Sequence, residues 1–167
     1  TTYLACNYLQ EILKMETLYI QLDHVLIDFE SGIEKLPQSI KKQYEGQLDK
    51  TPDLFEMSDP IPGSVASFNE LSTLFETYIV SISPWGNPAS WKLKLEWIKQ
   101  HFGDEAFDRL ILTHRKHLRK GEYLVDNRIR PGFDEFVGEH IHFGTEKFPN
   151  WYAVTYYLRN LKEMGSK

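Results

Sequence analysis

The stretch Tyr19-Ile20-Gln21-Leu22-Asp23-His24-Val25-Leu26-Ile27-Asp28-Phe29 joins an apolar run to a short acidic turn, which leads into an amphipathic segment. In α/β enzymes this order of residues places reactive side chains at the carboxyl end of a parallel strand, where ligands bind. Gln21 and Asp23 are polar side chains at this point of the chain. We therefore expect the functional site to lie where the first strand ends.

Further apolar runs follow this one, and segments with helical periodicity separate them. We expect strands at residues 18–26, 78–83, 110–113, 123–125 and 141–143, and helices at residues 64–77, 88–102 and 151–161. Strands that alternate with helices in this way are typical of a parallel sheet. The predicted fold class is therefore α/β, a doubly wound parallel sheet formed within residues 15–167.

The connection between the first strand and the helix expected at residues 64–77 is unusually long. It covers residues 30–63, contains four prolines and has room for two helices. Because a simple crossover is shorter, we expect a small helical cap insertion above the carboxyl end of the sheet. An elaborated surface loop is the alternative interpretation.

Residues 1–14 stand apart as an N-terminal extension. If this extension is helical, its apolar residues share one face; they are Tyr3, Leu4, Tyr8, Leu9, Ile12 and Leu13. Such a face predicts packing on the domain or a homodimer contact. An extension without function is the alternative.

The amino-acid composition indicates which classes of binding partner are not expected for this protein. The 167 residues carry a formal net charge of −5 and the pI is near 5.7, which gives no electrostatic reason to bind polymeric nucleic acid. Cys6 is the single cysteine, so an intramolecular disulfide bond is excluded and a reducing compartment is favoured. No apolar stretch approaches the roughly 20 residues that a membrane span needs. We therefore expect a cytoplasmic protein without a membrane partner.

Five short motifs lie in register along the chain, at residues 22–32, 83–88, 112–116, 123–126 and 139–144. Together they resemble the 5'(3')-deoxyribonucleotidase family of the haloacid-dehalogenase superfamily. The resemblance implies a Mg²⁺-dependent phosphatase that acts on nucleoside monophosphates. In that reaction an Asp attacks the phosphate to form an aspartyl-phosphate, and a second Asp serves as general acid and then base.

The resemblance also implies roles for individual residues. Asp23 matches the general acid–base and Lys116 the phosphate-binding lysine, and both count as catalytic. The implied metal-binding positions are Asp23, Asp126 and Asn127. The implied substrate-binding residues are Ser83, Trp85, Lys116 and Phe29, of which the two aromatic rings could stack on a base or pack in the core.

Three positions depart from the family pattern. Gln21 stands where the family has its nucleophilic Asp, Ile82 where it has a phosphate-binding Thr, and Asn127 where it has a second metal-binding Asp. A neutral amide neither forms an acyl-phosphate nor offers Mg²⁺ the anionic oxygen that it prefers. Three changes in three separate motifs favour natural divergence over one engineered substitution.

We therefore expect a nucleotide- or phosphate-binding protein with weak or no phosphatase activity, so its status as an enzyme stays open. The alternative is a non-catalytic interaction module on a retired phosphatase fold. A third possibility is a Mg²⁺ phosphatase in which water attacks directly with Asp23 as base.

Other charged and aromatic side chains are assigned ordinary structural roles. We expect His140 and His142, two residues apart, to be hydrogen-bonded histidines and not metal ligands. Asp28 is expected to cap a helix. Basic residues outside the motifs are expected to be solvated surface; they are Arg119, Lys120, Arg128 and Arg130.

Overall fold

The structure, a computed structural model, describes residues 15–48, 51, 54–83, 85, 88–113, 120–128 and 136–165. The extension at residues 1–14 and the predicted phosphate-binding Lys116 lie outside these described residues.

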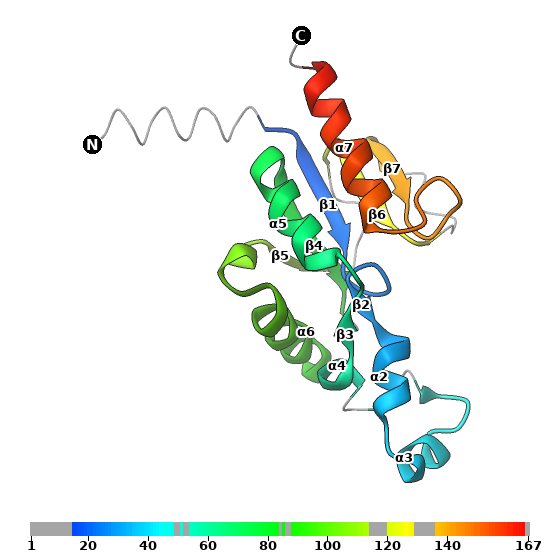
Figure 1. The fold of residues 1–167 in the computed structure, drawn as a ribbon. Coiled ribbons are helices and arrows are strands. Elements are labelled where there is room, and N and C mark those ends of the chain that lie inside the picture. The colour runs from blue at the N-terminus through cyan, green and yellow to red at the C-terminus, as the bar shows by residue number, and fades with distance from the viewer. Residues whose placement is uncertain are drawn as a thin grey trace.

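A parallel sheet of five strands forms the centre of the described chain (Figure 1). The strands are β1 (Thr17–Gln21), β4 (Glu76–Ile82), β5 (Leu110–Thr113), β6 (Tyr123–Asp126) and β7 (Glu139–His142). Their order is β5-β4-β1-β6-β7, and every neighbouring pair is parallel. β1 is the central strand, so the stretch that opens the sequence argument runs through the middle of the sheet. The predicted α/β fold class is confirmed.

Three long helices flank the sheet: α5 (Ser64–Leu74), α6 (Pro88–Phe102) and α7 (Trp151–Gly165). A 3₁₀ helix, η2 (Gly103–Ala106), follows α6. Side chains of all three helices share one buried cluster with apolar residues of the strands, and this cluster is the main core. Trp151 and Phe68 are among its largest fully buried side chains. Burial of each such side chain stabilises the fold by roughly 1.5–3 kcal/mol relative to exposure.

Successive residues of β1 point to opposite faces of the sheet. Leu18 and Ile20 belong to the main core, whereas Tyr19 belongs to a second, smaller cluster with Val80 and Leu124. By the same alternation Gln21, the last residue of β1, lies on the face of Tyr19. The strand therefore ends on a polar residue that faces away from the main core.

Two predicted boundaries differ from the structure. β1 ends at Gln21 and does not continue to residue 26, because the chain turns sharply after it. The carbonyl oxygen of Leu22 accepts hydrogen bonds from the backbone N–H groups of Leu26 at 3.0 Å and Ile27 at 3.1 Å. Likewise α5 ends at Leu74 and not at residue 77, because the chain from Glu76 onward pairs with β1.

The long connection between β1 and α5 contains several short elements. They are β2 (Ile27–Asp28), α2 (Phe29–Lys35), α3 (Gln38–Gln43), α4 (Leu54–Met57) and β3 (Asp59–Pro60). β2 and β3 pair in antiparallel fashion. In Figure 1 these elements lie beyond the carboxyl end of β1. We call residues 27–60 the inserted segment; its role as a cap over a ligand stays a prediction.

The buried indole groups of Trp97 and Trp151 attach the inserted segment and the turn after β1 to the long helices. Trp97 of α6 donates a hydrogen bond from Nε1 to the carbonyl oxygen of Ser58, at 2.8 Å. Trp151 of α7 donates from Nε1 to the carbonyl oxygen of Val25, also at 2.8 Å. The inserted segment and the turn after β1 are therefore both anchored to long helices. Asp28 caps α2 as predicted, because its side chain accepts from the N–H of Ser31.

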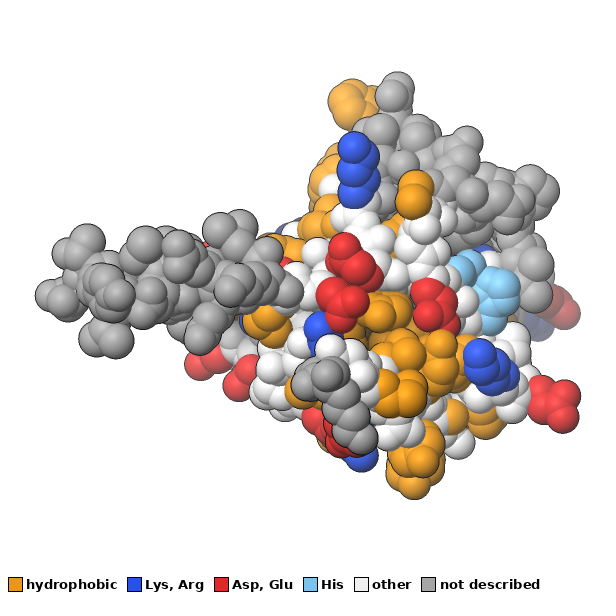
Figure 2. Space-filling model, turned by 90° about the horizontal axis from the view of Figure 1, so that it is seen from above, with side chains coloured by type: hydrophobic (Ala, Val, Ile, Leu, Met, Phe, Trp, Pro, Cys, Tyr) orange, Lys and Arg blue, Asp and Glu red, His pale blue; other side chains and the backbone are white. Residues whose placement is uncertain are grey.

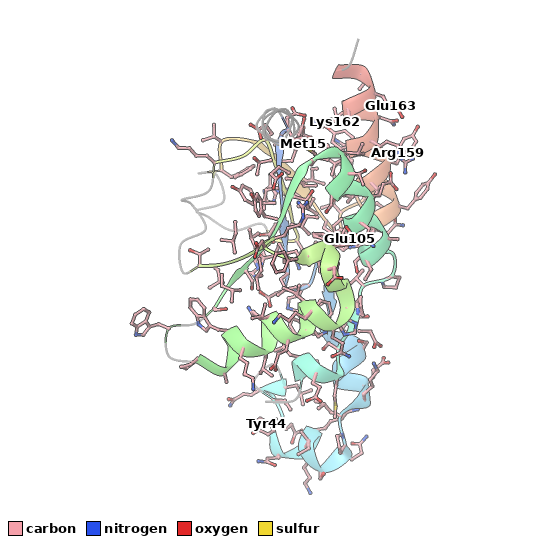
Figure 3. All side chains as sticks on the ribbon, turned by 90° about the vertical axis from the view of Figure 1, so that its left-hand side faces the viewer. Met15, Tyr44, Glu105, Arg159, Lys162 and Glu163 are labelled. Carbon is pink, nitrogen blue, oxygen red and sulfur yellow. The ribbon has the colours of Figure 1, made fainter. Side chains whose placement is uncertain are left out.

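At the opposite end of the molecule, an ion pair joins the start of β1 to the end of α7. Lys162 Nζ lies 2.5 Å from Glu16 Oε2. Figure 3 labels Met15, Arg159 and Lys162 in this region and Tyr44 at the far end, in the inserted segment.

The surface seen from above carries side chains of both charge signs, interspersed around hydrophobic ones (Figure 2). No helix in the described part of the chain is both long and apolar enough to span a bilayer.

Candidate functional site

Gln21 is fully buried at the carboxyl end of the central strand. Its side-chain Nε2 donates a hydrogen bond to Asp23 Oδ2 at 3.2 Å. An ionised carboxylate only accepts hydrogen bonds, so the amide must present its nitrogen to Asp23 and not its oxygen. The position at which the family has its nucleophile therefore carries a hydrogen-bond donor that contacts Asp23.

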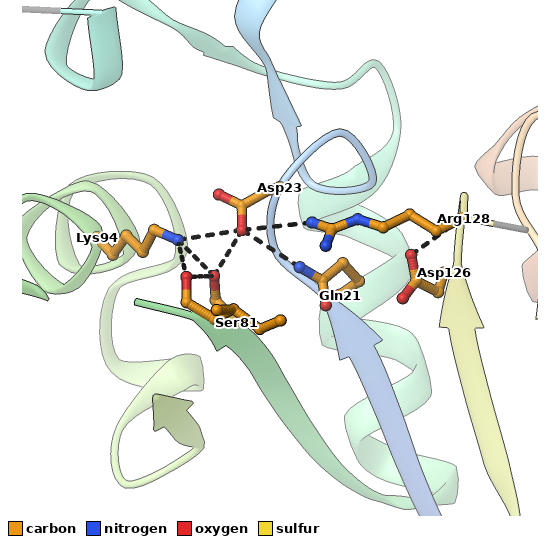
Figure 4. A network of polar contacts seen from close by, with 7 residues as sticks. Gln21, Asp23, Ser81, Lys94, Asp126 and Arg128 are labelled. Carbon is orange, nitrogen blue, oxygen red and sulfur yellow. Dashed lines mark hydrogen bonds and ion pairs between the residues drawn. The ribbon is translucent and has the colours of Figure 1, made fainter. Parts of the chain in front are cut away.

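Asp23 is the hub of a polar network in the turn after β1 (Figure 4). Besides the amide of Gln21, its Oδ2 atom accepts from Ser81 Oγ at 2.6 Å and from Lys94 Nζ at 3.1 Å. The guanidinium of Arg128 approaches the same oxygen at 4.0 Å. The Asp23 side chain is 13% exposed, so these donors replace most of the water that a free carboxylate would bind.

Lys94 reaches this network from α6 and is 4% exposed. Its ammonium has three hydrogen-bond partners, which are Asp23 Oδ2, Ser81 Oγ at 2.6 Å and the carbonyl oxygen of Ile82 at 2.7 Å. A buried charge is tolerated when it is paired and hydrogen-bonded in this way. No motif in the sequence pointed to Lys94. Its one signal was a lysine at helical spacing from the buried Trp97 and Ile98.

The end of β4 supplies three of the remaining groups. Ser81 bridges Lys94 and Asp23 through its hydroxyl, a role that the sequence argument did not assign. Ile82, at the predicted Thr position, contributes its carbonyl oxygen to Lys94. Ser83, predicted to bind substrate, is fully buried, and its Oγ has no hydrogen-bond partner among the described residues.

The end of β6 brings a second carboxylate to the same edge of the sheet. Asp126 is fully buried, and its Oδ1 accepts the backbone N–H of Arg128 at 3.2 Å. Asn127 between them is exposed. The prediction that Arg128 is solvated surface is wrong, because its side chain is 27% exposed and points toward Asp23. Its loop conformation, which the sequence did not reveal, turns the guanidinium inward.

The two aromatic residues predicted to bind substrate lie in different environments. Phe29 packs edge-on against His24 and Phe55, with ring centroids 4.9 Å and 5.1 Å away. Trp85 is 87% exposed. The prediction that either ring stacks on a base stays a prediction.

His140 and His142 on β7 were predicted to be hydrogen-bonded histidines, and they are hydrogen-bonded to each other. His142 Nε2 lies 2.7 Å from His140 Nδ1, so one of the two nitrogens carries the shared proton. Among the residues that the structure describes, no group of three or more His, Cys, Asp and Glu side chains is arranged to hold a metal ion.

The resemblance implies Mg²⁺, and the donor set can be tested against that ion. Mg²⁺ requires oxygen ligands in near-octahedral geometry and usually uses one or two carboxylates. Asp23 and Asp126 supply two carboxylates, but Gln21 turns an N–H₂ group toward Asp23, and the ammonium of Lys94 already occupies Asp23 Oδ2. A dication at this place would lie beside two protein cations, Lys94 and Arg128. The described residues do not fit Mg²⁺.

A hollow lies elsewhere, between α6, η2 and β5. Its volume is about 1120 Å³, and Trp91, Leu95 and Phe107 are among the residues that line it. The lining includes none of Gln21, Asp23 or Lys94, and it is mainly apolar. We assign the candidate site to the polar network because the titratable groups and the ends of three strands converge there.

Comparison with known proteins identifies the family. The family described as "5' nucleotidase, deoxy (Pyrimidine), cytosolic type C protein" matches residues 27–152. A Vibrio phage KVP40 protein named "Putative 5'(3')-deoxyribonucleotidase" is 48% identical over 141 residues, which cover 84% of this chain and 83% of that protein. The human protein named "5'(3')-deoxyribonucleotidase, cytosolic type" is 26% identical over 74% of this chain and 77% of its own length.

A solved structure supports the same fold. A haloacid dehalogenase-like family hydrolase from Xanthomonas campestris superimposes with a TM-score of 0.53 and 10% identity, over 92% of this chain and 99% of that one. At that identity the likeness shows the fold alone, whereas the sequence matches show the family. On these sequence matches, this chain belongs to the 5'(3')-deoxyribonucleotidase family.

Proposed function

We propose that this chain binds nucleoside monophosphates at the carboxyl end of β1 and hydrolyses them weakly or not at all. The ligand class follows from the family, whose named members are deoxyribonucleotidases. The observation that carries the second half of the proposal is the hydrogen bond from Gln21 to Asp23.

The family reaction needs a carboxylate at the end of β1. A carboxylate oxygen attacks phosphorus, and the acyl-phosphate that forms is later hydrolysed. The amide of Gln21 is a far weaker nucleophile, and its nitrogen is engaged with Asp23. Asp23, the expected acid–base, is itself held by three donors, so its proton transfer to a leaving group would first require that network to rearrange.

Binding is supported by other features of the same edge. Lys94 and Arg128 supply two positive charges, which suit a phosphate group. The buried hydroxyl of Ser83 has no partner among the described residues, and a ligand oxygen would satisfy it. The inserted segment lies beyond the same edge, in a position suited to cover a bound nucleotide.

Phosphate release from the four common deoxynucleoside monophosphates, with Mg²⁺ present, tests this proposal. The unmodified protein is compared with the Gln21→Asp, Ile82→Thr double variant and with Gln100→Asp, an exposed control on α6. We expect turnover in the double variant only. Turnover by the unmodified protein that is as fast as that of the double variant would overturn the proposal of a depleted site.

If neither protein releases phosphate and calorimetry detects no nucleotide binding, the proposed ligand is wrong as well. That outcome favours the alternative, an interaction module on a retired phosphatase fold.

A further inference from the structure

We propose that this site holds the phosphate group of its ligand without a divalent metal, with Lys94 and Arg128 in the electrostatic role that a metal would fill. The inference rests on the proposed function, because it takes a nucleoside monophosphate as the ligand. It goes further in assigning which groups neutralise the phosphate and which cofactor is dispensable.

The formal charges of the described groups at the strand ends are balanced. Two carboxylates, Asp23 and Asp126, and two cations, Lys94 and Arg128, meet there, so their formal charges cancel. An Asp at position 21 would make the same set net negative and attract a dication. With Gln21 in its place, a divalent cation gains no net attraction from the described groups, and it meets two positive charges at short range.

The atoms that surround Asp23 are mostly hydrogen-bond donors. A metal needs lone pairs, whereas a phosphate needs hydrogen-bond donors. Gln21 presents an N–H₂ group, Lys94 an ammonium and Arg128 a guanidinium. These donor groups offer a metal no lone pair. Those of Gln21 and Lys94 already serve protein acceptors, whereas the Arg128 guanidinium, 4.0 Å from Asp23, is placed to meet a phosphate oxygen.

The side chain of Arg128 lies farther from Asp23 than that of Lys94 does. Lys94 contacts Asp23 at 3.1 Å, but the Arg128 guanidinium stands 4.0 Å from the same oxygen. Its planar fork of five N–H donors matches two phosphate oxygens at once. The backbone N–H of Arg128 is held by Asp126, so the start of the side chain is fixed while its head faces Asp23. We assign the phosphate contact chiefly to Arg128, with Lys94 as the buried supporting charge.

The experiment is calorimetric titration of the unmodified full chain with each of the four common deoxynucleoside monophosphates, once in EDTA and once in Mg²⁺. We expect dissociation constants in the two buffers that agree within about twofold. Binding that is about tenfold or more tighter in Mg²⁺, or that occurs only in Mg²⁺, would overturn the metal-free site and leave the proposed ligand standing. Absence of binding in both buffers would instead overturn the proposed function.

Two variants test the assignment of the phosphate contact to Arg128. Arg128→Gln should weaken binding in EDTA by about tenfold or more. Arg159→Gln, which removes an arginine paired with Glu70 on the surface of α7, should leave binding unchanged. Equal affinities for Arg128→Gln and the unmodified chain would contradict the role of Arg128. Circular dichroism of both variants verifies that they are folded.

The Gln21→Asp variant tests directly whether the site can bind a metal, and the assay needs neither nucleotide nor turnover. Gln21→Asp restores a carboxylate beside Asp23 and Asp126 and should bind Mn²⁺ saturably, as detected by electron paramagnetic resonance with competition by Mg²⁺. The unmodified chain should show no saturable Mn²⁺ binding. Saturable binding by the unmodified chain that Asp126→Asn abolishes would overturn the inference.

Discussion

Lys94 and Asp23 are 71 residues apart in sequence and form an ion pair at 3.1 Å in which both side chains are largely buried. The pair joins α6 to the turn after the central strand. Such a pair is costly to desolvate, so its main effect appears when one partner is removed and the other is left as an uncompensated buried charge.

Lys94→Met should therefore destabilise the fold by about 3–5 kcal/mol, because Asp23 loses its neutralising partner. Urea unfolding, followed by far-UV circular dichroism, measures the loss. Lys92→Met is the matched control, since Lys92 lies on the same helix with its side chain 75% exposed. Addition of Asp23→Asn to Lys94→Met should recover part of the loss. Losses that simply add in the double variant would contradict this account.

Trp97→Phe should loosen the inserted segment. The substitution removes the donor that satisfies the buried carbonyl oxygen of Ser58, which costs about 1–3 kcal/mol. Hydrogen exchange should then rise in α4 and β3 while the central strand stays protected. Trp85→Phe is the control, because its ring is 87% exposed. Unchanged exchange in α4 would show that the anchor is not Trp97.

Gly32→Ala should disturb the packing of α2 on α4. A Cβ atom at this position would collide with Ser58 Oγ and lie 3.0 Å from the carbonyl oxygen of Leu54. Overpacking of this kind costs about 1–3 kcal/mol, measurable as a lower midpoint of urea unfolding. Gly165→Ala meets no atom within 4 Å and serves as the control. Ser58→Gly should relieve part of the defect; without any relief, the collision is not with Ser58.

His101 should make stability depend on pH below neutrality. Burial lowers the pKa of His101, and Lys35 lowers it further, while the nearby Asp59 acts in the opposite direction. The folded state therefore resists protonation, and the unfolded chain takes up the proton first as pH falls through about 6.5. Stability from this group is present above that pH and is lost below it.

Unfolding free energies at about pH 7.5 and pH 5.5 test the effect of His101. His101→Gln should lose less stability between the two values than the unmodified chain does. His24→Gln, which alters an exposed histidine, should behave like the unmodified chain. Parallel losses in all three proteins would rule out His101 as the titrating group.

The sequence predicted the sheet because each strand is a short apolar run between polar turns. Through the resemblance to the family, the sequence also implied one site for Gln21, Asp23 and Asp126, and these side chains lie close together at the ends of β1 and β6. It failed for Lys94 and Arg128. The position of Lys94 depends on which face of α6 docks on β4, and that of Arg128 on the conformation of one loop. The periodicity of apolar residues predicts neither of these two positions.

Trp97 and Lys94 stand three residues apart on α6 and so share one face of a single helix. One side chain holds the backbone at Ser58, and the other holds the carboxylate of Asp23. One turn of α6 therefore joins the inserted segment at Ser58 to the carboxylate of Asp23, so the two contacts share a single rigid support.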